Sequence, residues 1–281
     1  MNVNMFDNVA TKENIETLKK RGFHFVDPEV GALACGWNGT GRLADPWEIF
    51  YATKRLLSNQ DLAGKKVLIT TGPTRELVDP VRFISNRSSG KMGVELARDA
   101  YLRGAEVTLV HGPVEIKVPC EIKTLSVITA KEMYDVVIEN SFNVENTPDI
   151  IIMAAAVADF KPKEVSEFKI KKNQNFEKIE LEPNTDIISS VSKTRGDEKR
   201  PFLVGFAVET GEEPDELILK VEEKMKAKNL DMIIGNFAHE AFELDTNRVW
   251  IVSKAGKQQE VATTYKSRIA ERILTAIVKQ F

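Results

Sequence analysis

The chain has 281 residues and a formal net charge of -3, with 39 Lys and Arg residues against 42 Asp and Glu residues. This balance lacks the basic excess typical of proteins that bind duplex nucleic acid, and no apolar run approaches the roughly 20 residues that span a bilayer. The polar amino terminus, the two cysteines (Cys35 and Cys120) and three scattered histidines predict a cytoplasmic protein without a signal peptide, a disulfide scaffold or a zinc site.

The first sixty residues predict a small segment of helices and irregular loops that buries little core of its own. Residues 11–21 predict a short helix, residues 28–46 are glycine-rich and irregular, and residues 46–57 predict a second helix with Pro46 in its first turn. We place the domain boundary in the polar connector at residues 58–64, which gives domains 1–62 and 63–281.

From residue 64 onward, strands and helices alternate. The expected strands are residues 67–71, 106–110, 122–127, 149–156, 202–207, 231–235 and 249–252. The expected helices begin at Ser89, after a capping box formed by Thr129 and Glu132, and at residues 214–228 and 263–278. This alternation predicts a doubly wound, Rossmann-like α/β fold with a mostly parallel sheet.

In such sheets, ligands bind beyond the carboxyl ends of the strands, near the point where the strand order reverses. This rule selects four segments, which are residues 72–91, 154–172, 184–187 and the turn after Phe206. We expect the ligand-binding residues to lie there.

Residues 88–90 lie where a helix is expected to begin, so their N–H groups can bind an anion. Arg82 and Lys91 add positive charge nearby. The alternative is an ordinary helix cap with solvated cations. The segment contains neither G-x-G-x-x-G nor G-x-x-x-x-G-K-[ST], which disfavours a dinucleotide fingerprint and a Walker-type ATPase.

Asp159 follows a predicted central strand, where it can hold a ribose hydroxyl or a magnesium ion, or serve only as a turn residue. The lysine-rich residues 169–175 form either a flap over phosphates or a solvated surface. Lys224 and Lys228 share one helix face. Because no Ser-His-Asp set, Cys-His pair or metal-binding helix appears, the pattern favours a reaction driven by positioning and electrostatics, such as nucleotidyl transfer.

Residues 63–281 resemble the phosphopantothenate–cysteine ligase family of coenzyme A biosynthesis. The motifs that carry the resemblance occur in the family's order over the whole segment. They are TGPTRE (71–76), DPVR (79–82), ISN (84–86), SSGKMG (88–93), AAVADF (155–160), KIKK (169–172), GFA (205–207) and KNLD (228–231).

Residues 1–62 resemble the carboxyl-terminal part of phosphopantothenoylcysteine decarboxylase, through MNVNM (1–5) and ACG (34–36). The resemblance implies that Asn2 contacts a substrate carboxylate and that Cys35 is the proton donor. It also implies FMN, but only for a flavin-binding body upstream of Met1. We therefore expect Cys35 to be silent in this chain.

The ligase resemblance implies CTP and Mg²⁺ as co-substrate and cofactor. The carboxylate of 4'-phosphopantothenate attacks the α-phosphorus of CTP, pyrophosphate leaves, and the amine of cysteine then displaces CMP from the acyl-cytidylate. The family's ligase is a homodimer, and a flavin-containing decarboxylase is a further expected partner.

The resemblance also implies roles for individual residues. Asn86 matches a contact to the acyl-cytidylate, Lys169 a lysine needed for CTP activation, and Asp159 a nucleotide-binding acid and the metal ligand. The other nucleotide contacts implied are Asn184, Thr185 (in place of the family's proline), Asp186, Ile187, Phe206, Lys224 and Lys228. The implied substrate contacts are Arg82, Asn86, Ser88, Ser89, Gly90, Ala155 and Ala156.

Two alternatives remain open at this point. One is a nicotinamide-dependent oxidoreductase on the same fold, against which the missing glycine fingerprint counts. The other is a non-catalytic module that donates the Cys35 segment to a separate decarboxylase.

Overall fold

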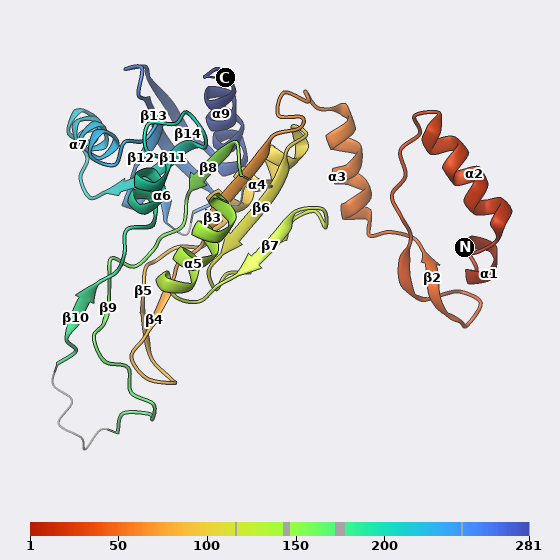
Figure 1. Cartoon of the computed structure of the whole chain (residues 1–281), viewed down its shortest axis with the longest axis horizontal. Coiled ribbons are helices and arrows are strands. Elements are labelled where there is room, and N and C mark those ends of the chain that lie inside the picture. Colours follow the sequence, from red (N-terminus) through yellow and green to blue (C-terminus); the bar gives the residue numbers. More distant parts are fainter. Residues whose placement is uncertain (116, 143–146, 172–177, 243, 281) are drawn as a thin grey trace. The chain divides into compact units, whose positions relative to one another are not determined.

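The computed structural model describes residues 1–115, 117–142, 147–171, 178–242 and 244–280. The chain divides into two compact units, Met1–Ser58 and Asn59–Phe281, which are described separately (Figure 1). The division falls at the start of the connector predicted at residues 58–64. Within the described ranges, no helix has the length and apolar character needed to cross a membrane.

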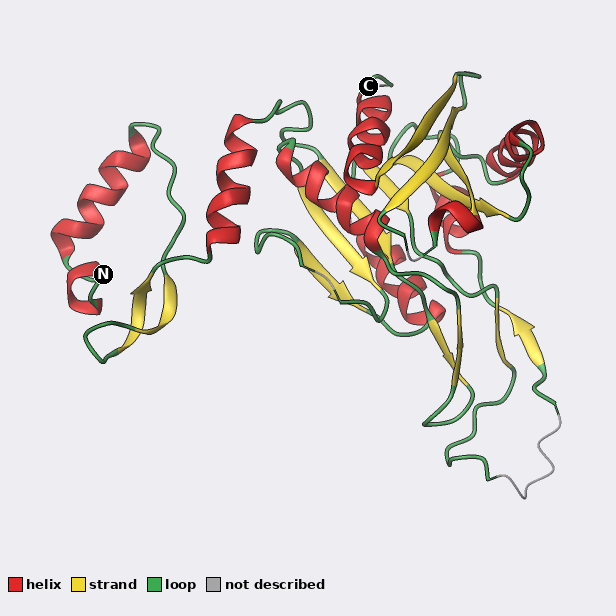
Figure 2. Cartoon of the chain, turned by 180° about the vertical axis from the view of Figure 1, so that it is seen from behind, coloured by secondary structure: helices red, strands yellow, loops and turns green. Residues whose placement is uncertain are grey.

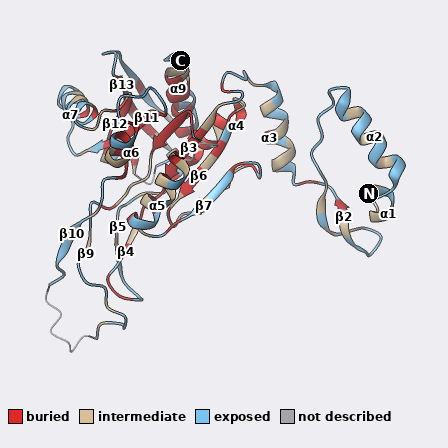
Figure 3. Cartoon of the chain, in the orientation of Figure 1, coloured by how far each residue is buried: buried red, intermediate tan, exposed pale blue. Residues whose placement is uncertain are grey.

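The amino-terminal unit combines helices with one antiparallel hairpin. Its elements are α1 (Val3–Phe6), α2 (Val9–Lys20), β1 (Glu29–Ala32), β2 (Asn38–Arg42) and α3 (Pro46–Leu57). Two of them, α2 and α3, confirm the predicted helices, although α2 begins two residues earlier than expected. Neither α1 nor α2 contains a buried residue, and Figure 3 shows how exposed this unit is.

The expectation of an irregular stretch at residues 28–46 is wrong where β1 pairs with β2. The sequence hides this hairpin because glycines at positions 31, 39 and 41 replace the apolar side chains that normally mark a strand. The start of α3 agrees with expectation. Asp45 Oδ1 accepts the N–H of Trp47 at 2.8 Å, and Pro46 occupies the first turn.

The second unit is built on a large, mostly parallel sheet (Figure 1). Over the described residues, its eight strands are ordered β14-β13-β12-β11-β8-β3-β6-β7. The strands are β3 (Lys66–Thr71), β6 (Glu106–His111), β7 (Lys123–Ser126), β8 (Ile150–Met153), β11 (Phe202–Glu209), β12 (Met232–Phe237), β13 (Thr246–Ser253) and β14 (Gln258–Tyr265). All pairs from β7 to β12 are parallel, and β13 and β14 extend the sheet antiparallel, so the predicted doubly wound fold is confirmed.

The chain order reverses between β3 and β8. From β3 the chain runs outward through β6 to β7, returns to β8 on the other side of β3, and continues through β11 to β12. Such a reversal leaves a crevice at the carboxyl ends of the two central strands, because their connections leave in opposite directions. Two of the ligand-binding segments predicted from the sequence begin directly after these strands, at residues 72 and 154. The turn expected after Phe206 is wrong, because β11 continues to Glu209.

Helices cover both faces of the sheet (Figure 2). On one face, α4 (Lys91–Leu102) packs against α9 (Lys266–Val278). On the other face, one buried cluster joins α5 (Ala130–Ser141), α6 (Ile187–Arg195) and α7 (Pro214–Ala227) to the sheet. The short α8 (Ala238–Ala241) follows β12.

Several predicted boundaries are wrong, and three of them have a clear structural reason. The helix expected from Ser89 begins at Lys91, because Gly90 occupies a left-handed conformation with φ 71° before it. The strand expected at residues 149–156 is β8, which ends at Met153, and its apolar run continues as a loop in which Ala156 N–H donates to Gly72 O at 2.9 Å. Residues 263–265, expected in the last helix, belong to β14, a largely polar strand at the edge of the sheet.

Two β-hairpin arms, which the sequence analysis did not predict, leave the sheet on the same side (Figure 2). The first pairs β4 (Arg75–Leu77) with β5 (Phe83–Ser85). The second pairs β9 (Phe160–Pro162) with β10 (Leu181–Pro183). The arms touch each other, because β4 lies in contact with β9.

Candidate active site

A cavity of about 760 Å³ opens at the carboxyl edge of the sheet. Its walls come from the segment between β5 and α4, the loop after β8, the start of α6, and β11. Most of the residues predicted to bind ligands line it. They are Asn86, Ser88, Ser89, Gly90, Ala155, Ala156, Asp159, Asn184, Thr185, Asp186, Ile187, Phe206, Lys224 and Lys228.

The remaining predicted residues do not line this cavity. Arg82 and Lys169 lie on the two hairpin arms, and Asn2 and Cys35 belong to the other unit. Lys172 and residues 173–175 of the predicted flap lie outside the described residues.

The amino end of α4 forms one wall, where residues 88–93 line the cavity. Gly90 is required at the helix start, because its positive φ of 71° strains any residue with a Cβ atom. Its carbonyl accepts a hydrogen bond from Thr71 Oγ1 at 2.6 Å, which ties the helix start to the end of β3. Gly90 N–H donates to Ser88 Oγ at 3.3 Å, so the N–H groups that can bind an anion here are those of the first turn of α4.

The amino end of α6 forms a second wall. Asp186 caps this helix, since its Oδ1 accepts the N–H of Ser189 at 3.1 Å. Its Oδ2 lies 2.8 Å from Nζ of Lys228. Burial raises the pKa of Asp186, but the hydrogen bonds from Lys228 and Ser189 outweigh burial and hold the pKa below its usual value.

Two asparagine side chains hold the loop after β8. The amide of Asn86 donates to the carbonyl oxygens of Ala156 and Val157 at 3.2 and 3.0 Å. The amide of Asn184 donates to Ala158 O at 2.9 Å. These bonds fix the backbone next to Asp159, whose side chain is exposed at the cavity.

Two lysines at the carboxyl end of α7, Lys224 within the helix and Lys228 as its cap, bring positive charge to the same cavity. Lys224 pairs with Glu209 at the end of β11, at 2.5 Å, and Lys228 pairs with Asp186. Both lysines line the cavity together with Phe206. The cavity thus offers these two lysines and two helix amino ends, among other groups, to a polyanionic ligand.

Four lysines line the cavity, Lys91, Lys224, Lys228 and Lys266, and the last of them was missed from the sequence. Lys266, the first residue of α9, is buried, and its ammonium group donates to Ala241 O at 2.9 Å and to Leu244 O. Burial and the nearby Lys91 lower the pKa of Lys266. Lys91 itself pairs with Asp245. No sequence signal marks Lys266, since its partners, at the end of α8 and just after it, lie more than twenty positions earlier.

The tip of the first arm is joined to the second arm around one buried carboxylate. Asp79 is 0% exposed, and its Oδ2 accepts hydrogen bonds from Arg82 Nη1 at 2.7 Å and from Ile170 N–H at 3.2 Å. Arg82 Nη1 also donates to Ile170 O at 3.2 Å. Both backbone groups of the residue after Lys169 are therefore held by the first arm.

One carboxylate at the cavity has the chemistry of a magnesium ligand. Mg²⁺ is commonly bound by one or two carboxylates together with substrate phosphates and water, and Asp159 offers one exposed carboxylate here.

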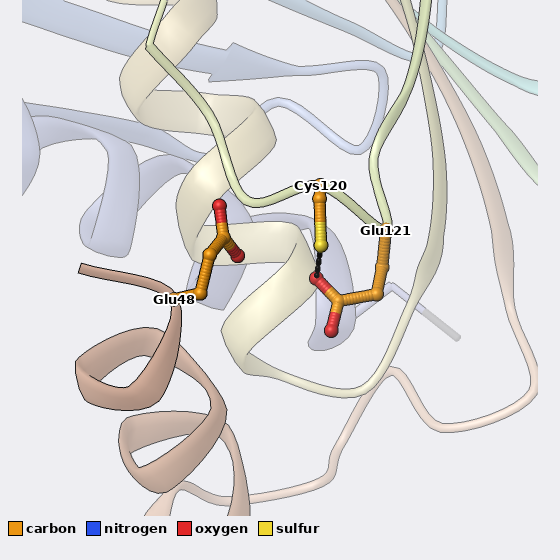
Figure 4. A group of neighbouring side chains, drawn as sticks. All are labelled: Glu48, Cys120 and Glu121. Carbon is orange, nitrogen blue, oxygen red and sulfur yellow. Dashed lines mark hydrogen bonds between the residues drawn. The ribbon is translucent and has the colours of Figure 1, made fainter. Parts of the chain in front are cut away.

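Elsewhere, Cys120 Sγ contacts Oε2 of Glu121 at 3.4 Å (Figure 4), and neither residue lines the cavity. Glu48, also drawn in Figure 4, belongs to the amino-terminal unit.

The amino-terminal unit has a small cavity of its own, of about 410 Å³. Asn2 and Cys35 both line it, and Asn2 Nδ2 donates to Cys35 Sγ at 3.3 Å. A hydrogen bond from the backbone of Trp37, reinforced by Asn2, lowers the pKa of the Cys35 thiol. The two residues selected from the sequence are thus brought together.

Two family descriptions match the chain. Residues 62–281 match the DNA/pantothenate metabolism flavoprotein C-terminal domain, and residues 1–58 match the Flavoprotein family. Among relatives, the chain is 40% identical over 285 residues to the coenzyme A biosynthesis bifunctional protein CoaBC of Vibrio cholerae, which covers 100% of this chain and 69% of the relative. The CoaBC of Mycobacterium tuberculosis is 38% identical over 290 residues, covering 99% of this chain and 68% of the relative.

Solved structures agree with these matches. The crystal structure of the C-terminal domain of a CoaBC protein superposes with a TM-score of 0.65 at 37% identity, covering 79% of this chain and 98% of that domain. A Cab2 mutant solved in complex with phosphopantothenate-cysteine shares the fold, with a TM-score of 0.53 at 19% identity, covering 83% of this chain and 91% of that one.

Proposed function

Because the chain belongs to the CoaBC family of coenzyme A biosynthesis, whose C-terminal domain it carries at residues 62–281, we propose that it joins 4'-phosphopantothenate to cysteine with CTP as co-substrate. The single observation that carries this proposal is the cavity at the reversal point of the sheet. It gathers residues from four separate segments into one site with two helix amino ends and four lysines. These groups suit a nucleoside triphosphate and a phosphorylated acid.

The reaction proceeds in two balanced steps. The carboxylate of 4'-phosphopantothenate attacks the α-phosphorus of CTP, and the bond to the leaving pyrophosphate breaks. The cysteine amine then attacks the acyl carbon of the acyl-cytidylate, CMP leaves with the bonding electrons, and the amine gives up a proton as the amide forms. Neither step needs a covalent bond to the protein, so positioning and charge stabilisation carry the catalysis.

Each wall of the cavity has a role in this scheme. The amino ends of α4 and α6 bind phosphate groups, and Lys224 and Lys228 neutralise the triphosphate. Asp159 holds the nucleotide and its Mg²⁺, which supplies Lewis-acid polarisation of the phosphates when bound. The amide of Asn86 donates to Ala156 O and Val157 O, and it exchanges one of these acceptors for the acyl oxygen as charge develops there.

Lys169 activates the nucleotide in the first step. It lies on the second arm, outside the lining of the cavity, and its backbone is fixed by the contacts of Ile170. The homodimer expected from the resemblance belongs to this proposal as well.

The amino-terminal unit is proposed to be the substrate-clamp part of a decarboxylase, with Cys35 as the proton donor. Its closeness to Asn2 and its lowered pKa support this assignment. FMN belongs to the remainder of that enzyme. The described residues of the unit expose most of their large apolar side chains, and we derive no flavin-dependent step from them.

The test measures pyrophosphate release by the purified protein with Mg²⁺, 4'-phosphopantothenate and cysteine, with CTP or ATP, and with each component omitted in turn. We expect release that requires 4'-phosphopantothenate and is faster with CTP. Pyrophosphate release that does not depend on 4'-phosphopantothenate would contradict the ligase activity. Equal rates of release with CTP and ATP would contradict CTP as the preferred nucleotide. A titration with NAD(P)H monitored by fluorescence, expected to show no change, checks the oxidoreductase alternative.

A further inference from the structure

We propose that Asp79 is a positioning residue that fixes Lys169 by holding both backbone groups of Ile170, directly and through Arg82. This inference rests on the proposed role of Lys169 in nucleotide activation. It assigns a function to the buried carboxylate of the first arm, which lies outside the cavity and which no part of the proposed chemistry uses.

The geometry around Asp79 divides its two oxygens between two tasks. Oδ1 accepts the N–H groups of Val81 and Arg82 at 2.7 and 2.8 Å, which shapes the tip of the first arm. Oδ2 accepts Arg82 Nη1 and the N–H of Ile170, which belongs to the second arm. One carboxylate thus stabilises its own turn and also binds a segment about ninety positions away in the chain.

Arg82 binds the carbonyl group of the same residue, Ile170. Its Nη1 donates both to Asp79 Oδ2 and to Ile170 O, so the N–H and the C=O of Ile170 are held by one ion pair. A further bond from Ser166 N–H to Val78 O, at 3.0 Å, joins the arms before Lys169. The backbone is therefore anchored on both sides of Lys169, while its side chain stays exposed.

Fixing this backbone matters because a flexible lysine loses rotamer and backbone freedom when it binds a phosphate. An anchored backbone has already lost part of that freedom, so less is lost in the transition state. Arg82 was expected to contact substrate. In the structure, Nη1 of its guanidinium donates to Asp79 and Ile170, and the side chain is 49% exposed and lies outside the cavity lining.

The first test is a double-mutant cycle between Asp79→Asn and Lys169→Gln, measured as nucleotide-dependent pyrophosphate release. Asparagine keeps the size of the side chain but places an NH2 group against donors that the carboxylate accepted. We expect Asp79→Asn to lower kcat by roughly tenfold to a hundredfold, with little change in the KM for cysteine. In the Lys169→Gln background the same change should have no further effect, because its target is gone.

A matched control comes from another buried carboxylate. Asp149 accepts Lys66 N–H at 2.9 Å and pairs with Lys65 and Arg200, at the amino end of the strands. Asp149→Asn should affect stability but change the rate by the same factor in both backgrounds. A merely structural Asp79 would behave in the same way, so multiplicative effects of Asp79→Asn would overturn the proposal.

A second readout does not depend on activity. Tryptic cleavage after Lys169 and Lys171, followed by mass spectrometry, should be about tenfold faster in Asp79→Asn and in Arg82→Gln than in wild type. Arg82→Gln leaves the buried carboxylate in place and serves if Asp79→Asn does not fold. Unchanged cleavage in both variants would show that Asp79 and Arg82 do not fix the backbone at Ile170. If the wild type releases no pyrophosphate, the proposed function fails, whereas the cleavage result still decides whether the two arms are joined as described.

Discussion

Nζ of Lys228 lies 2.8 Å from Oδ2 of Asp186, so a lysine expected to bind nucleotide phosphate is already paired with a carboxylate of the same cavity. Asp186 also caps α6 through its other oxygen. The pair therefore places the ammonium group beside a helix amino end, where an anion is stabilised. A phosphate that binds there must compete with the carboxylate for the same lysine.

Lys224 repeats this arrangement one helical turn earlier, with Glu209 as its partner. The side chain of Glu209 is 15% exposed and also faces Lys220 at 3.8 Å. The lysines are thus oriented before a ligand arrives, at the cost of an exchange of partners when it binds. Because the lysines are already oriented, less entropy is lost when the ligand binds, which strengthens binding. The exchange of partners weakens binding, and mutation can separate the two effects.

Asp186→Asn should strengthen nucleotide binding. Asparagine retains an oxygen that caps α6, but it removes the charge that competes for Lys228. Since exposed ion pairs contribute little, we expect the KM for nucleotide to fall about two- to fivefold, while Lys228→Gln should raise it. Asp215→Asn, on the exposed first turn of α7, is the control and should leave KM unchanged. An unchanged or higher KM in Asp186→Asn would refute the competition.

The same carboxylate should contribute to stability in a defined pH range. Its pKa in the folded protein lies below its usual value of 3.8, because hydrogen bonds from Lys228 and Ser189 outweigh burial. The unfolded chain therefore binds more protons between the two pKa values, and the free energy of unfolding falls as pH falls through them. The stabilisation should be complete above the usual value and lost below the folded pKa.

The measurement compares urea unfolding of wild type and Asp186→Asn at a series of pH values from neutral to about pH 2.5. The difference in the free energy of unfolding should be constant at neutral and mildly acidic pH and should shrink at the acid end. A difference that stays constant to the lowest pH would mean that Asp186 does not titrate as described.

Much of the fold could be predicted, because its strands are apolar runs separated by amphipathic helices. The buried residues of β8 predict a central strand, and a rule about strand order then places the ligand site at the reversal point. The cavity residues follow from this rule together with the family motifs. What the pattern could not give is the point where an apolar run stops being a strand, as after Met153.

The hairpin arms and the charges around them were beyond prediction. β4 and β5 have three residues each, too few for an alternating pattern to register. Asp79 reads as a turn acid, although it holds a residue of the other arm. Lys266 reads as an ordinary lysine of an amphipathic helix, although its ammonium group holds two carbonyls beside the cavity. In each case the partner is distant in sequence, and only the folded chain brings the two together.

Gly93→Ala should separate α4 from β3. A Cβ atom at position 93 would lie 2.4 Å from Cβ and Oγ1 of Thr71, and this oxygen holds Gly90 O at the helix start. We expect a loss of about 1–3 kcal/mol in the free energy of unfolding and a higher KM for nucleotide, because the phosphate-binding turn shifts. Urea unfolding and steady-state kinetics measure the two effects.

The control for this substitution is Gly211→Ala, in which the new Cβ would meet its nearest neighbour, in Phe237, at 3.8 Å. It should stay within about 0.5 kcal/mol of wild type. If the Gly93 and Gly211 variants had equal free energies of unfolding, α4 and β3 would accommodate the added methyl group without loss of stability.

Asn86→Asp should separate the two chemical steps. The amide donates to Ala156 O and Val157 O, and a carboxylate at this position would face those oxygens without a proton to share. It would also withhold the hydrogen bond that stabilises charge on the acyl oxygen during attack by cysteine, a loss of roughly a hundredfold or more. The first step depends less on this donor, so the acyl-cytidylate should accumulate and be seen by mass spectrometry after a rapid quench.

The matched control is Asn140→Asp, since the amide of Asn140 donates to Val136 O on α5, and this variant should turn over normally. Normal turnover in Asn86→Asp itself would remove Asn86 from the second step.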